Sequence, residues 1–524
     1  MKKFRGLRSS TIILLFTFAI FPLHGTHSQA STVYFVDNQL TANCLNNNYS
    51  IATRSCTGTD GNAYIKINDA IRAVPAGGII NVRQGTYQEV YNYLRHYQAE
   101  AAFYIDKPLT LKNYNSEEVT LTYIPSHPPK YANGLSYIIY IVSNDVTLDG
   151  FTIVGTKTLG DNVDNDNDVN IYIEKYLSNV TIRNNIIKQA GHAGVKYLLP
   201  KGLILVEKNQ FYDIGFTPRD HGIYGYTENN NTVSKIIRQN IFHNISGYGI
   251  HLYSESSNHD VYNNIVYNNT NGGILITGDH QKIYNNVIYG NQGQGGLVLF
   301  GGLGYYVHDE NIQNNIIWNN VLDVNCGSDT YSNIFEHNIV QTMSGSGCPG
   351  TTNLAIDPQF ISSPPTSWPD FRLANGSPLV DQGTDLGYPY NLALDPASTA
   401  WPPLLGDQNY YGSKWEIGAF VAGSAATPPP DTTPPTVSIT SPLNNTSVPK
   451  NSTIIISATA SDNVGVSKLE FYVNGSLVCT DILPSYTCSW QTPRKANQGI
   501  QFTAKAYDAA GNTANSAVVQ VTTS

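Results

Sequence analysis

Apolar residues in the middle of this 524-residue chain occur as short β-branched runs separated by asparagine and glycine. One such phrase, a polar pair that usually ends in Asn followed by two apolar residues, returns between about residues 179 and 340. Its asparagines are Asn185, Asn209, Asn240, Asn264, Asn286, Asn315 and Asn338, at steps of 24, 31, 24, 22, 29 and 23 residues. Repeats of this length predict a solenoid, with one coil for each repeat.

A second landmark, a glycine followed by an aliphatic residue, recurs out of phase with the first. It lies at Gly194, Gly222, Gly249, Gly273 and Gly296. Two landmarks in a repeat too short for a pair of helices indicate several short strands per coil. The sequence therefore predicts a parallel β-helix, with neighbouring coils about 4.8 Å apart.

The repeated asparagine has a structural explanation at the bend between two strands. Its amide can hydrogen-bond the asparagine of the coil above and of the coil below, and asparagine tolerates the left-handed conformation that such bends need. We predict an internal asparagine ladder rather than a ligand site.

The alternation of these two landmarks resembles the right-handed parallel β-helix repeat of the pectate-lyase-like superfamily. The resemblance covers most of residues 31–423 and implies an all-β solenoid fold. It does not fix the chemistry, because that superfamily includes lyases, hydrolases, epimerases and binding proteins.

Both ends of the solenoid carry a different pattern. Ile67, Ala70, Ile71 and Val74 recur at helical spacing, so we predict a short amphipathic helix that covers the N-terminal end. The segment from Asp357 to Phe420 resembles the closing segment of secreted β-helix proteins, and we predict that it forms the last coil and a C-terminal cap.

A proline-rich stretch at 424–435 predicts a stiff linker. Beyond it, residues 436–524 show strands about every ten residues with turn signals between them, which predicts a β-sandwich. The strings Ser461-Asp-Asn-Val-Gly-Val and Ala506-Tyr-Asp-Ala-Ala-Gly-Asn resemble bacterial immunoglobulin-like modules, which implies a role in spacing or attachment.

Residues 1–30 combine basic residues, an apolar run from Ile12 to Phe21 and a terminal Ser-Gln-Ala, which predicts a secretory signal peptide. No later apolar run is long enough to cross a membrane. The net charge of −9 argues against a nucleic-acid partner. We expect an exported, monomeric protein that meets an extracellular glycan.

Six cysteines fall as three close pairs, Cys44 with Cys56, Cys326 with Cys348, and Cys479 with Cys488. An exported chain with local pairs favours three disulfides. Zinc is the competing interpretation, but no pair has the usual metal-ligand spacing.

The acidic stretch with Asp164, Asp166 and Asp168 alternates carboxylates in the way that suits a calcium ion. It fails the EF-hand pattern, since Val169 stands where glycine is required. A calcium site and a solvated acidic loop both remain open.

Aligning the coils on their glycines gives a candidate site. Lys196, Tyr224 and His251 lie two positions after the glycine, and Tyr226 and Tyr253 lie four positions after it. The residues between them are aliphatic and should face inward, so both sets should face outward on successive coils. Arg219, Asp220 and His221 come just before this strand and Glu255 just after it, whereas His192 and His280 read as ordinary surface residues.

Such a row suits proton abstraction beside a carboxylate, as in β-elimination from a uronic-acid polymer. Lys196 or Arg219 would neutralise the sugar carboxylate, His251 or His221 would be the base, and Tyr224 or Tyr253 the acid. Asp220, Tyr226, Tyr253 and Glu255 would join Arg219 in binding the substrate.

Three alternatives to a lyase remain. Hydrolysis needs two carboxylates roughly 5 to 10 Å apart, whereas Asp220 and Glu255 are offset by eight residues in the register. The segment Gly215-Phe-Thr-Pro-Arg-Asp220 resembles one in mannuronan epimerases, but Thr217 and Arg219 replace the Asp and His that carry their chemistry. A non-catalytic glycan-binding or adhesive face would use the same residues.

Overall fold

The computed structural model describes residues 32–92, 100–123, 136–155, 157, 168–227, 233–253, 256–301, 306–345, 347–348, 350, 352–398, 400–422, 432–462, 466–481, 486–508 and 510–524. The predicted signal peptide, Asp164, Asp166, Glu255 and most of the predicted linker lie outside these residues.

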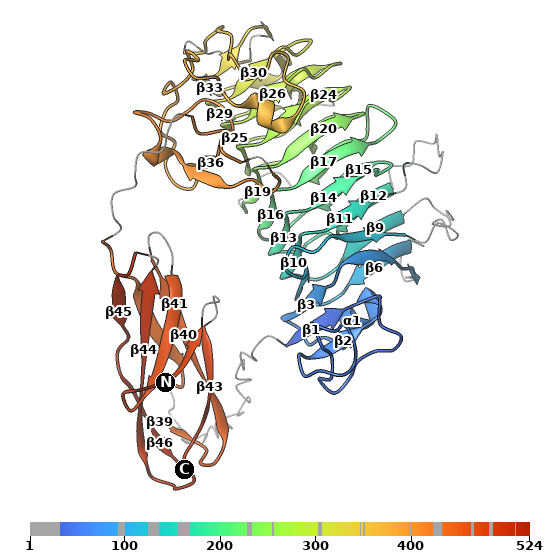
Figure 1. Cartoon of the computed structure of the whole chain (residues 1–524). Helices are drawn as coiled ribbons and strands as arrows, with labels where there is room; N and C mark the ends of the chain where they lie inside the picture. Colours follow the sequence, from blue (N-terminus) through green and yellow to red (C-terminus); the bar gives the residue numbers. More distant parts are fainter. Residues whose placement is uncertain are drawn as a thin grey trace, which may run out of the picture.

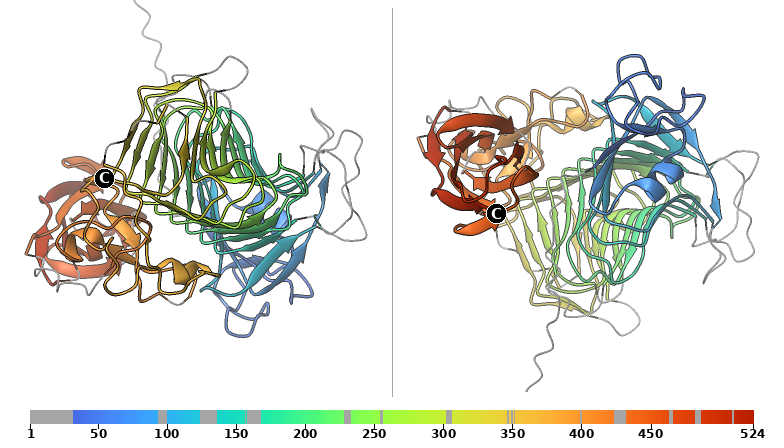
Figure 2. Two further views of the ribbon diagram at one scale, coloured as in Figure 1. Left: turned by 90° about the horizontal axis from the view of Figure 1, so that it is seen from above. Right: turned by 90° about the horizontal axis from the view of Figure 1, so that it is seen from below.

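Three parallel sheets wind into a right-handed β-helix (Figure 1), which confirms the predicted fold class. In the regular part of the solenoid each coil contributes one strand to each sheet, and each strand pairs in parallel with its counterparts in the coils before and after. Viewed from above and below, successive coils overlie one another (Figure 2).

The first sheet contains, in order, β2 (Asn62–Tyr64), β1 (Val33–Val36), β3 (Gly78–Val82), β7 (Leu109–Asn113), β10 (Val146–Asp149), β13 (Val180–Arg183), β16 (Ile204–Glu207), β19 (Lys235–Arg238), β22 (His259–Tyr262), β25 (Lys282–Tyr284), β29 (Asn311–Gln313) and β33 (Ile334–Glu336). The second contains β4 (Gly85–Gln88), β8 (Val119–Thr122), β11 (Thr152–Val154), β14 (Ile186–Lys188), β17 (Gln210–Ile214), β20 (Ile241–Ile245), β23 (Ile265–Tyr267), β26 (Val287–Tyr289), β30 (Ile316–Trp318) and β34 (Ile339–Val340). The third contains β5 (Tyr91–Asn92), β6 (Glu100–Ile105), β9 (Ser136–Ile141), β12 (Asp168–Ile173), β15 (Ala193–Leu198), β18 (His221–Tyr226), β21 (Tyr248–Tyr253), β24 (Gly272–Ile276), β27 (Gly295–Leu299), β31 (Val324–Cys326) and β35 (Met343–Ser344).

The asparagine ladder is present as predicted. Each side-chain Nδ2 donates to the Oδ1 of the asparagine in the next coil, as from Asn209 to Asn240 at 3.0 Å and from Asn240 to Asn264 at 3.0 Å. The series runs from Asn185 through Asn338 to Asn353. The left-handed conformation, however, belongs to the residue just before each ladder asparagine, for example Asn263 with φ 55° and Asn285 with φ 53°.

A second ladder, which the sequence analysis did not predict, lies at the bend after the second sheet. Asn269 donates to Asn291 at 2.9 Å, and Asn291 donates to Asn320 at 3.0 Å. In the coils of Asn269, Asn291 and Asn320, two bends are therefore filled by amides that hydrogen-bond along the axis, so the buried backbone groups there have partners.

The N-terminal end is covered by helix α1 (Ile67–Ala73), as predicted, with Ile67, Ala70 and Ile71 buried. The buried Glu89 accepts hydrogen bonds from the backbone N–H groups of Ile67 and Asn68, so its carboxylate caps the first turn of the helix. No described helix is long and apolar enough to cross a membrane.

The closing segment differs from the prediction of a last coil and cap. It contains β36 (Leu392–Leu394), β37 (Leu405–Asp407) and the 3₁₀ turns η2 (Trp368–Phe371) and η3 (Gln408–Tyr410). It runs back along the outside of the β-helix, where Phe371 and Leu394 pack in one cluster with the outward residues Ile265 and Ile316 of the second sheet. The indole of Trp401 even reaches the carbonyl of Lys208, far back along the chain.

The physical reason lies in the apolar doublet that follows most of the ladder asparagines. The second residue of the doublet faces the interior, as Val266 does, and the first faces outward, as Ile265 does, yet both are fully buried. A strand that is apolar on both faces needs a covering layer on its outer side. The closing segment provides that layer.

All three predicted disulfides are present, Cys44–Cys56, Cys326–Cys348 and Cys479–Cys488. A small two-stranded parallel pair, β28 (Val307–His308) with β32 (Thr330–Tyr331), lies beside the last coils.

The C-terminal region is a sandwich of antiparallel strands with its own core, which includes Phe471 and Phe502. One sheet contains β38 (Thr436–Ser441), β40 (Thr453–Ser461) and β43 (Thr487–Gln491). The other contains β39 (Thr446–Val448), β46 (Val519–Thr523), β44 (Gly499–Asp508), β41 (Val466–Val473) and β42 (Ser476–Asp481), with β45 (Thr513–Asn515) paired to β44.

Candidate functional site

The third sheet has the register that the glycine alignment predicts. Lys196 pairs with Tyr224, and Tyr224 pairs with His251, on strands β15, β18 and β21. Val195, Ile223 and Ile250, which precede them, are fully buried in the interior. The side chains of the row therefore lie on the outer face of three successive coils, about 4.8 Å apart.

Aromatic contacts join this row to the tyrosines four positions after the glycine. The ring centroids of Tyr224 and Tyr253 are 5.3 Å apart, and those of Tyr226 and Tyr253 are 6.2 Å apart. The Lys196 ammonium lies 5.1 Å from the Tyr224 ring centroid, within cation–π distance. The row thus combines a cation with an aromatic surface.

His221 and His251 form a hydrogen-bonded pair. Nε2 of His221 lies 2.9 Å from Nδ1 of His251, and Nδ1 of His221 accepts the backbone N–H of Tyr248 at 3.2 Å. Burial is the main cause that lowers the pKa of His221 well below its usual range and that of His251 to about 3. Both imidazoles are therefore neutral at neutral pH.

Asp220 holds a third histidine, His192, which is not the ordinary surface residue that its sequence context predicts. Its Oδ1 lies 3.1 Å from Nδ1 of His192, while its Oδ2 accepts the backbone N–H groups of Phe216 and Thr217. His192 is almost fully buried, and its ring centroid lies 5.8 Å from that of Tyr224. It therefore belongs to the same cluster as Tyr224 and His251.

The sequence held a signal for this pair. His192 precedes Gly194 by two positions and Asp220 precedes Gly222 by two positions, so the same alignment places them on neighbouring coils. Of the other predicted substrate-binding residues, Arg219 is exposed, and Glu255 lies outside the described residues.

The row also extends further than predicted, toward the N-terminal end. Tyr104, Tyr140 and Tyr172 pair in register with one another and then with Lys196. The rings of Tyr137 and Tyr172 stack at 4.7 Å, and the Tyr140 hydroxyl donates to Glu174. The signal for these tyrosines was their alternation with isoleucine in Ile139-Tyr-Ile141 and Ile171-Tyr-Ile173, before the glycine landmark begins.

Calcium binding by the acidic stretch stays a prediction, since two of its three aspartates lie outside the described residues. Asp168 is nearly buried at the start of β12, and its backbone carbonyl accepts the N–H of His192 at 2.8 Å. Within the described ranges, no group of three or more His, Cys, Asp or Glu side chains has a geometry suited to a metal ion.

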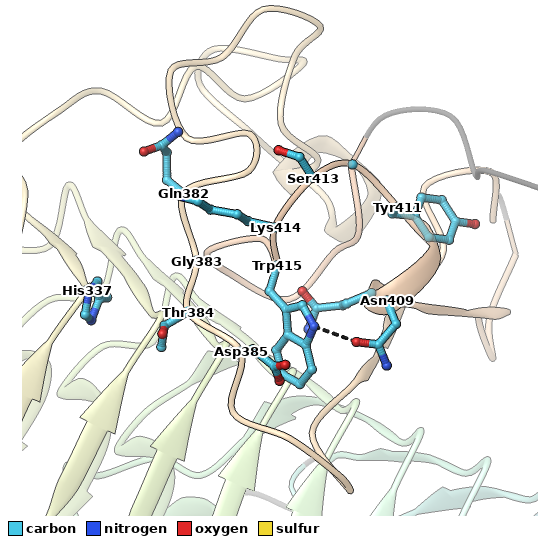
Figure 3. A pocket seen from close by; sticks show the side chains of 12 residues that line it. His337, Gln382, Gly383, Thr384, Asp385, Asn409, Tyr411, Ser413, Lys414 and Trp415 are labelled. Carbon is cyan, nitrogen blue, oxygen red and sulfur yellow. Dashed lines mark hydrogen bonds between the residues drawn. The ribbon is translucent and has the colours of Figure 1, made fainter.

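A separate pocket of about 450 Å³ lies in the closing segment (Figure 3). Its lining includes His337, Asp385, Asn409, Tyr411, Lys414 and Trp415. The indole N–H of Trp415 donates to the side-chain oxygen of Asn409 at 3.0 Å. This pocket shares no residue with the third-sheet row.

Comparison with known families agrees with the observed architecture. Residues 131–292 and 236–353 match the family described as a right handed beta helix region, and residues 435–519 match the bacterial Ig domain family. The chain therefore contains a right-handed parallel β-helix region followed by a C-terminal domain that matches the bacterial Ig family.

Among individual proteins, the chain is 41% identical over 129 residues to chitinase Chi52 of Paenibacillus xylanexedens, a match that covers 24% of this chain and 23% of the chitinase. It thus spans less than a quarter of that relative. Among solved structures it is similar to pectate lyase Pel9A, with 14% identity, 75% and 97% of the two chains covered and a TM-score of 0.42. The periplasmic alginate epimerase AlgG gives 13% identity, 56% and 82% coverage and a TM-score of 0.32.

Proposed function

We propose that this protein binds an extracellular, uronic-acid-containing polysaccharide on the outer face of the third sheet and cleaves it by β-elimination. The observation that carries the proposal is the convergence of Lys196, three histidines and Tyr224 on neighbouring coils. β-Elimination needs a cation at the substrate carboxylate, a base for the neighbouring proton and an acid for the leaving oxygen. This cluster holds all three kinds of group.

Hydrolysis is supported less well. It needs one carboxyl group as acid and a second as nucleophile or base. Asp220, the carboxylate in contact with this cluster, uses both oxygens for hydrogen bonds to His192 and to the turn at Phe216 and Thr217. Its role is to hold the histidine and the turn.

Ultraviolet absorbance tests the reaction, because only elimination creates the absorbing unsaturated uronic product. The chain would be incubated with pectin, polygalacturonate, alginate, hyaluronan and chondroitin, with calcium and with a chelator. Turnover of at least one polymer is expected, and the chelator decides whether calcium takes part. An absence of product with every polymer would overturn the proposal.

Lys196→Met should then lower turnover about 100-fold, because the substrate carboxylate loses its cation in a site where charge stabilisation dominates. Lys201→Met is the matched control, since Lys201 lies over the Tyr176 ring instead. Equal turnover by the two variants would remove Lys196 from the site.

A non-catalytic glycan-binding function is the second candidate, and the tyrosine row favours it. Tyr172 is partly exposed and continues the aromatic surface beyond Lys196, on a coil that carries no histidine at the same position, whereas Tyr104 and Tyr140 are buried behind it. Tyrosine rings are the flat surfaces on which sugars pack. Glycan affinity that falls in Tyr172→Ala, together with no turnover of any polymer, would favour this function over the lyase.

A further inference from the structure

Two histidines approach Tyr224 from neighbouring coils, and each is held by a different partner. The ring centroid of His192 lies 5.8 Å from that of Tyr224, and the ring centroid of His251 lies 5.2 Å from it. His192 is hydrogen-bonded to the Asp220 carboxylate, and His251 is hydrogen-bonded to the imidazole of His221. A neutral imidazole has one N–H and one proton-accepting nitrogen. The hydrogen-bond partners therefore determine which ring nitrogen carries the proton and which can accept one.

The tautomer of His251 is determined by a series of hydrogen bonds that begins at a backbone N–H group. The N–H of Tyr248 can only donate, so the Nδ1 of His221 must accept and its proton must lie on Nε2. That Nε2–H then donates to Nδ1 of His251 across 2.9 Å. With its Nδ1 occupied as an acceptor, a neutral His251 carries its own proton on Nε2.

The tautomer of His192 is determined by the Asp220 carboxylate. Asp220 accepts two backbone N–H groups at Oδ2, and its Oδ1 lies 3.1 Å from Nδ1 of His192. A carboxylate accepts and does not donate, so the proton of a neutral His192 lies on Nδ1. Its Nε2 is then left as a proton acceptor, the arrangement by which a carboxylate orients a catalytic histidine.

We infer that the two histidines beside Tyr224 are held in opposite tautomers, so that His192 presents a basic Nε2 and His251 presents an Nε2–H donor. Asp220 and His221 are the positioning residues that fix these states. The roles that follow rest on the proposed β-elimination. They place the base at His192, which the sequence did not single out, and make His251 a donor to the substrate carboxylate.

All proton transfers of the proposed β-elimination take place among His192, Tyr224 and the substrate. Nε2 of His192 takes the proton from the carbon beside the carboxylate, and the electrons of that C–H bond form the new C=C bond. The C–O bond to the next sugar breaks, and its oxygen takes a proton from the Tyr224 hydroxyl. The imidazolium of His192 then returns a proton to the Tyr224 oxygen, and both residues are restored.

Nitrogen NMR of the full chain labelled with ¹⁵N-histidine measures the tautomers directly, because the two ring nitrogens have different shifts in each tautomer. His192→Gln and His251→Gln assign the two signals by their loss. The expected result is protonated Nδ1 at His192 and protonated Nε2 at His251. The opposite state at either residue, or a charged His251 at neutral pH, would overturn the inference.

His221→Phe tests the cause of the His251 state. Removing the donor to Nδ1 should release His251 into a mixture of tautomers and leave His192 unchanged, whereas a purely structural role for His221 would leave the His251 signal as it is. His243→Phe is the matched control, because His243 is stacked between Tyr212 and Tyr267 on the second sheet. Should His221→Phe not fold, the wild-type spectra still decide the inference.

Kinetics with a polymer that the chain cleaves test the roles. His192→Gln should lower kcat at least about 100-fold with little change in substrate affinity, as expected for loss of a general base. His251→Gln keeps an N–H donor and should retain more activity than His192→Gln. The reverse order would overturn the assigned roles. If no polymer is cleaved, the proposed function fails, and the NMR result stands or falls separately.

Discussion

Asn240 illustrates how many hydrogen bonds a single ladder residue makes. Its Nδ2 donates to Asn264, to the carbonyl of Val206 and to the carbonyl of Arg238, and its Oδ1 accepts from the side chain and backbone of Asn209. No water reaches this fully buried side chain. Removal of the amide would leave the backbone N–H of Asn209 without its acceptor and would take one hydrogen bond from each of the other groups, and that loss makes buried polar ladders costly to interrupt.

We therefore expect Asn240→Ala to destabilise the β-helix by about 2–4 kcal/mol, because several buried groups each lose a hydrogen bond at once. Chemical or thermal unfolding followed by circular dichroism measures the change. Asn325→Ala is the control, since that side chain makes one exposed hydrogen bond, to Gln294 at 3.2 Å. A loss at Asn240 no larger than at Asn325 would show that the ladder adds nothing to stability.

A buried polar column lies at the start of the first-sheet strands. Lys235 pairs with His259, Nδ1 of His259 lies 3.0 Å from Oε1 of Gln281, and the N–H of Gln281 donates to Glu310. All four are fully buried. Burial lowers the pKa of Lys235 to about 7 and raises that of Glu310 well above its usual range.

The sign of the resulting pH dependence follows from linkage. Lys235 loses its proton near pH 7 in the folded chain but near 10.5 when unfolded, so between these values the unfolded state binds more protons. Stability should therefore rise with pH across this window, by about 2–4 kcal/mol. Lys235→Met should remove the rise. The exposed Lys414→Met should keep it, and a wild-type chain with flat stability over this window would contradict the prediction.

The ladder could be predicted because asparagine recurs at one position of successive coils, and the third-sheet row because the recurring glycine fixes the register of its strands. His192 does not recur from coil to coil, so its identity alone does not single it out, although the glycine alignment places it beside Asp220 on the next coil. The recurrence of asparagine predicted the left-handed bend at the ladder asparagine itself. The amide of that residue is engaged along the axis, so the preceding residue, such as Asn263, adopts the left-handed backbone instead.

At the scale of the element, the bend after the second sheet has a left-handed residue in each coil from β14 to β30, beginning with Gln189 (φ 57°). Asp213, Asn244, Asn268 and Asn319 all have positive φ, and Gly290 replaces them in one coil. Asparagine, aspartate and glycine are the residues that accept this conformation at low cost. The strand length of each coil is thus set partly by where such a residue falls.

The preference of this bend for residues that tolerate positive φ can be tested at Asn244, which is exposed and has φ 55°. Asn244→Val should be less stable than Asn244→Gly by about 1–2 kcal/mol, because a β-branched residue is strained in the left-handed region. Unfolding midpoints of the two variants measure the difference. Equal midpoints would mean that the bend relaxes to another conformation.

The second sheet shows what element patterns could not reveal. Its apolar doublets indicate strands, but a doublet alone does not say which part of the chain covers the outer residue. The covering segment comes from residues beyond 353 and meets strands as early as β20. Its own pattern resembles a cap, and only its long-range contacts, such as that of Trp401 with Lys208, place it along the side.

At the scale of the whole molecule, the β-helix and the immunoglobulin domain have separate cores. None of the residues in the core around Phe471 and Phe502 belongs to the interior of the β-helix. The order of the two parts and the three local disulfides followed from the sequence because each depends on near neighbours in the chain.

We expect a chain that ends at residue 422 to keep the unfolding transition of the β-helix. Scanning calorimetry of the full chain should show two transitions, and the shortened chain should lack only that of the immunoglobulin domain. A shift of the remaining transition to a clearly lower temperature would show that the domain stabilises the β-helix.

The parallel pairing on the third sheet has a consequence for how ligand preference can change. The distance between Tyr140, Tyr172, Lys196, Tyr224 and His251 is fixed by backbone hydrogen bonds between coils and not by the side chains themselves. Substitutions can change which side chain each coil presents in the row but cannot change the spacing between successive coils. For the proposed polysaccharide ligand, a repeat that does not fit that spacing cannot be accommodated by point mutation, and only the gain or loss of an entire coil would lengthen or shorten the row.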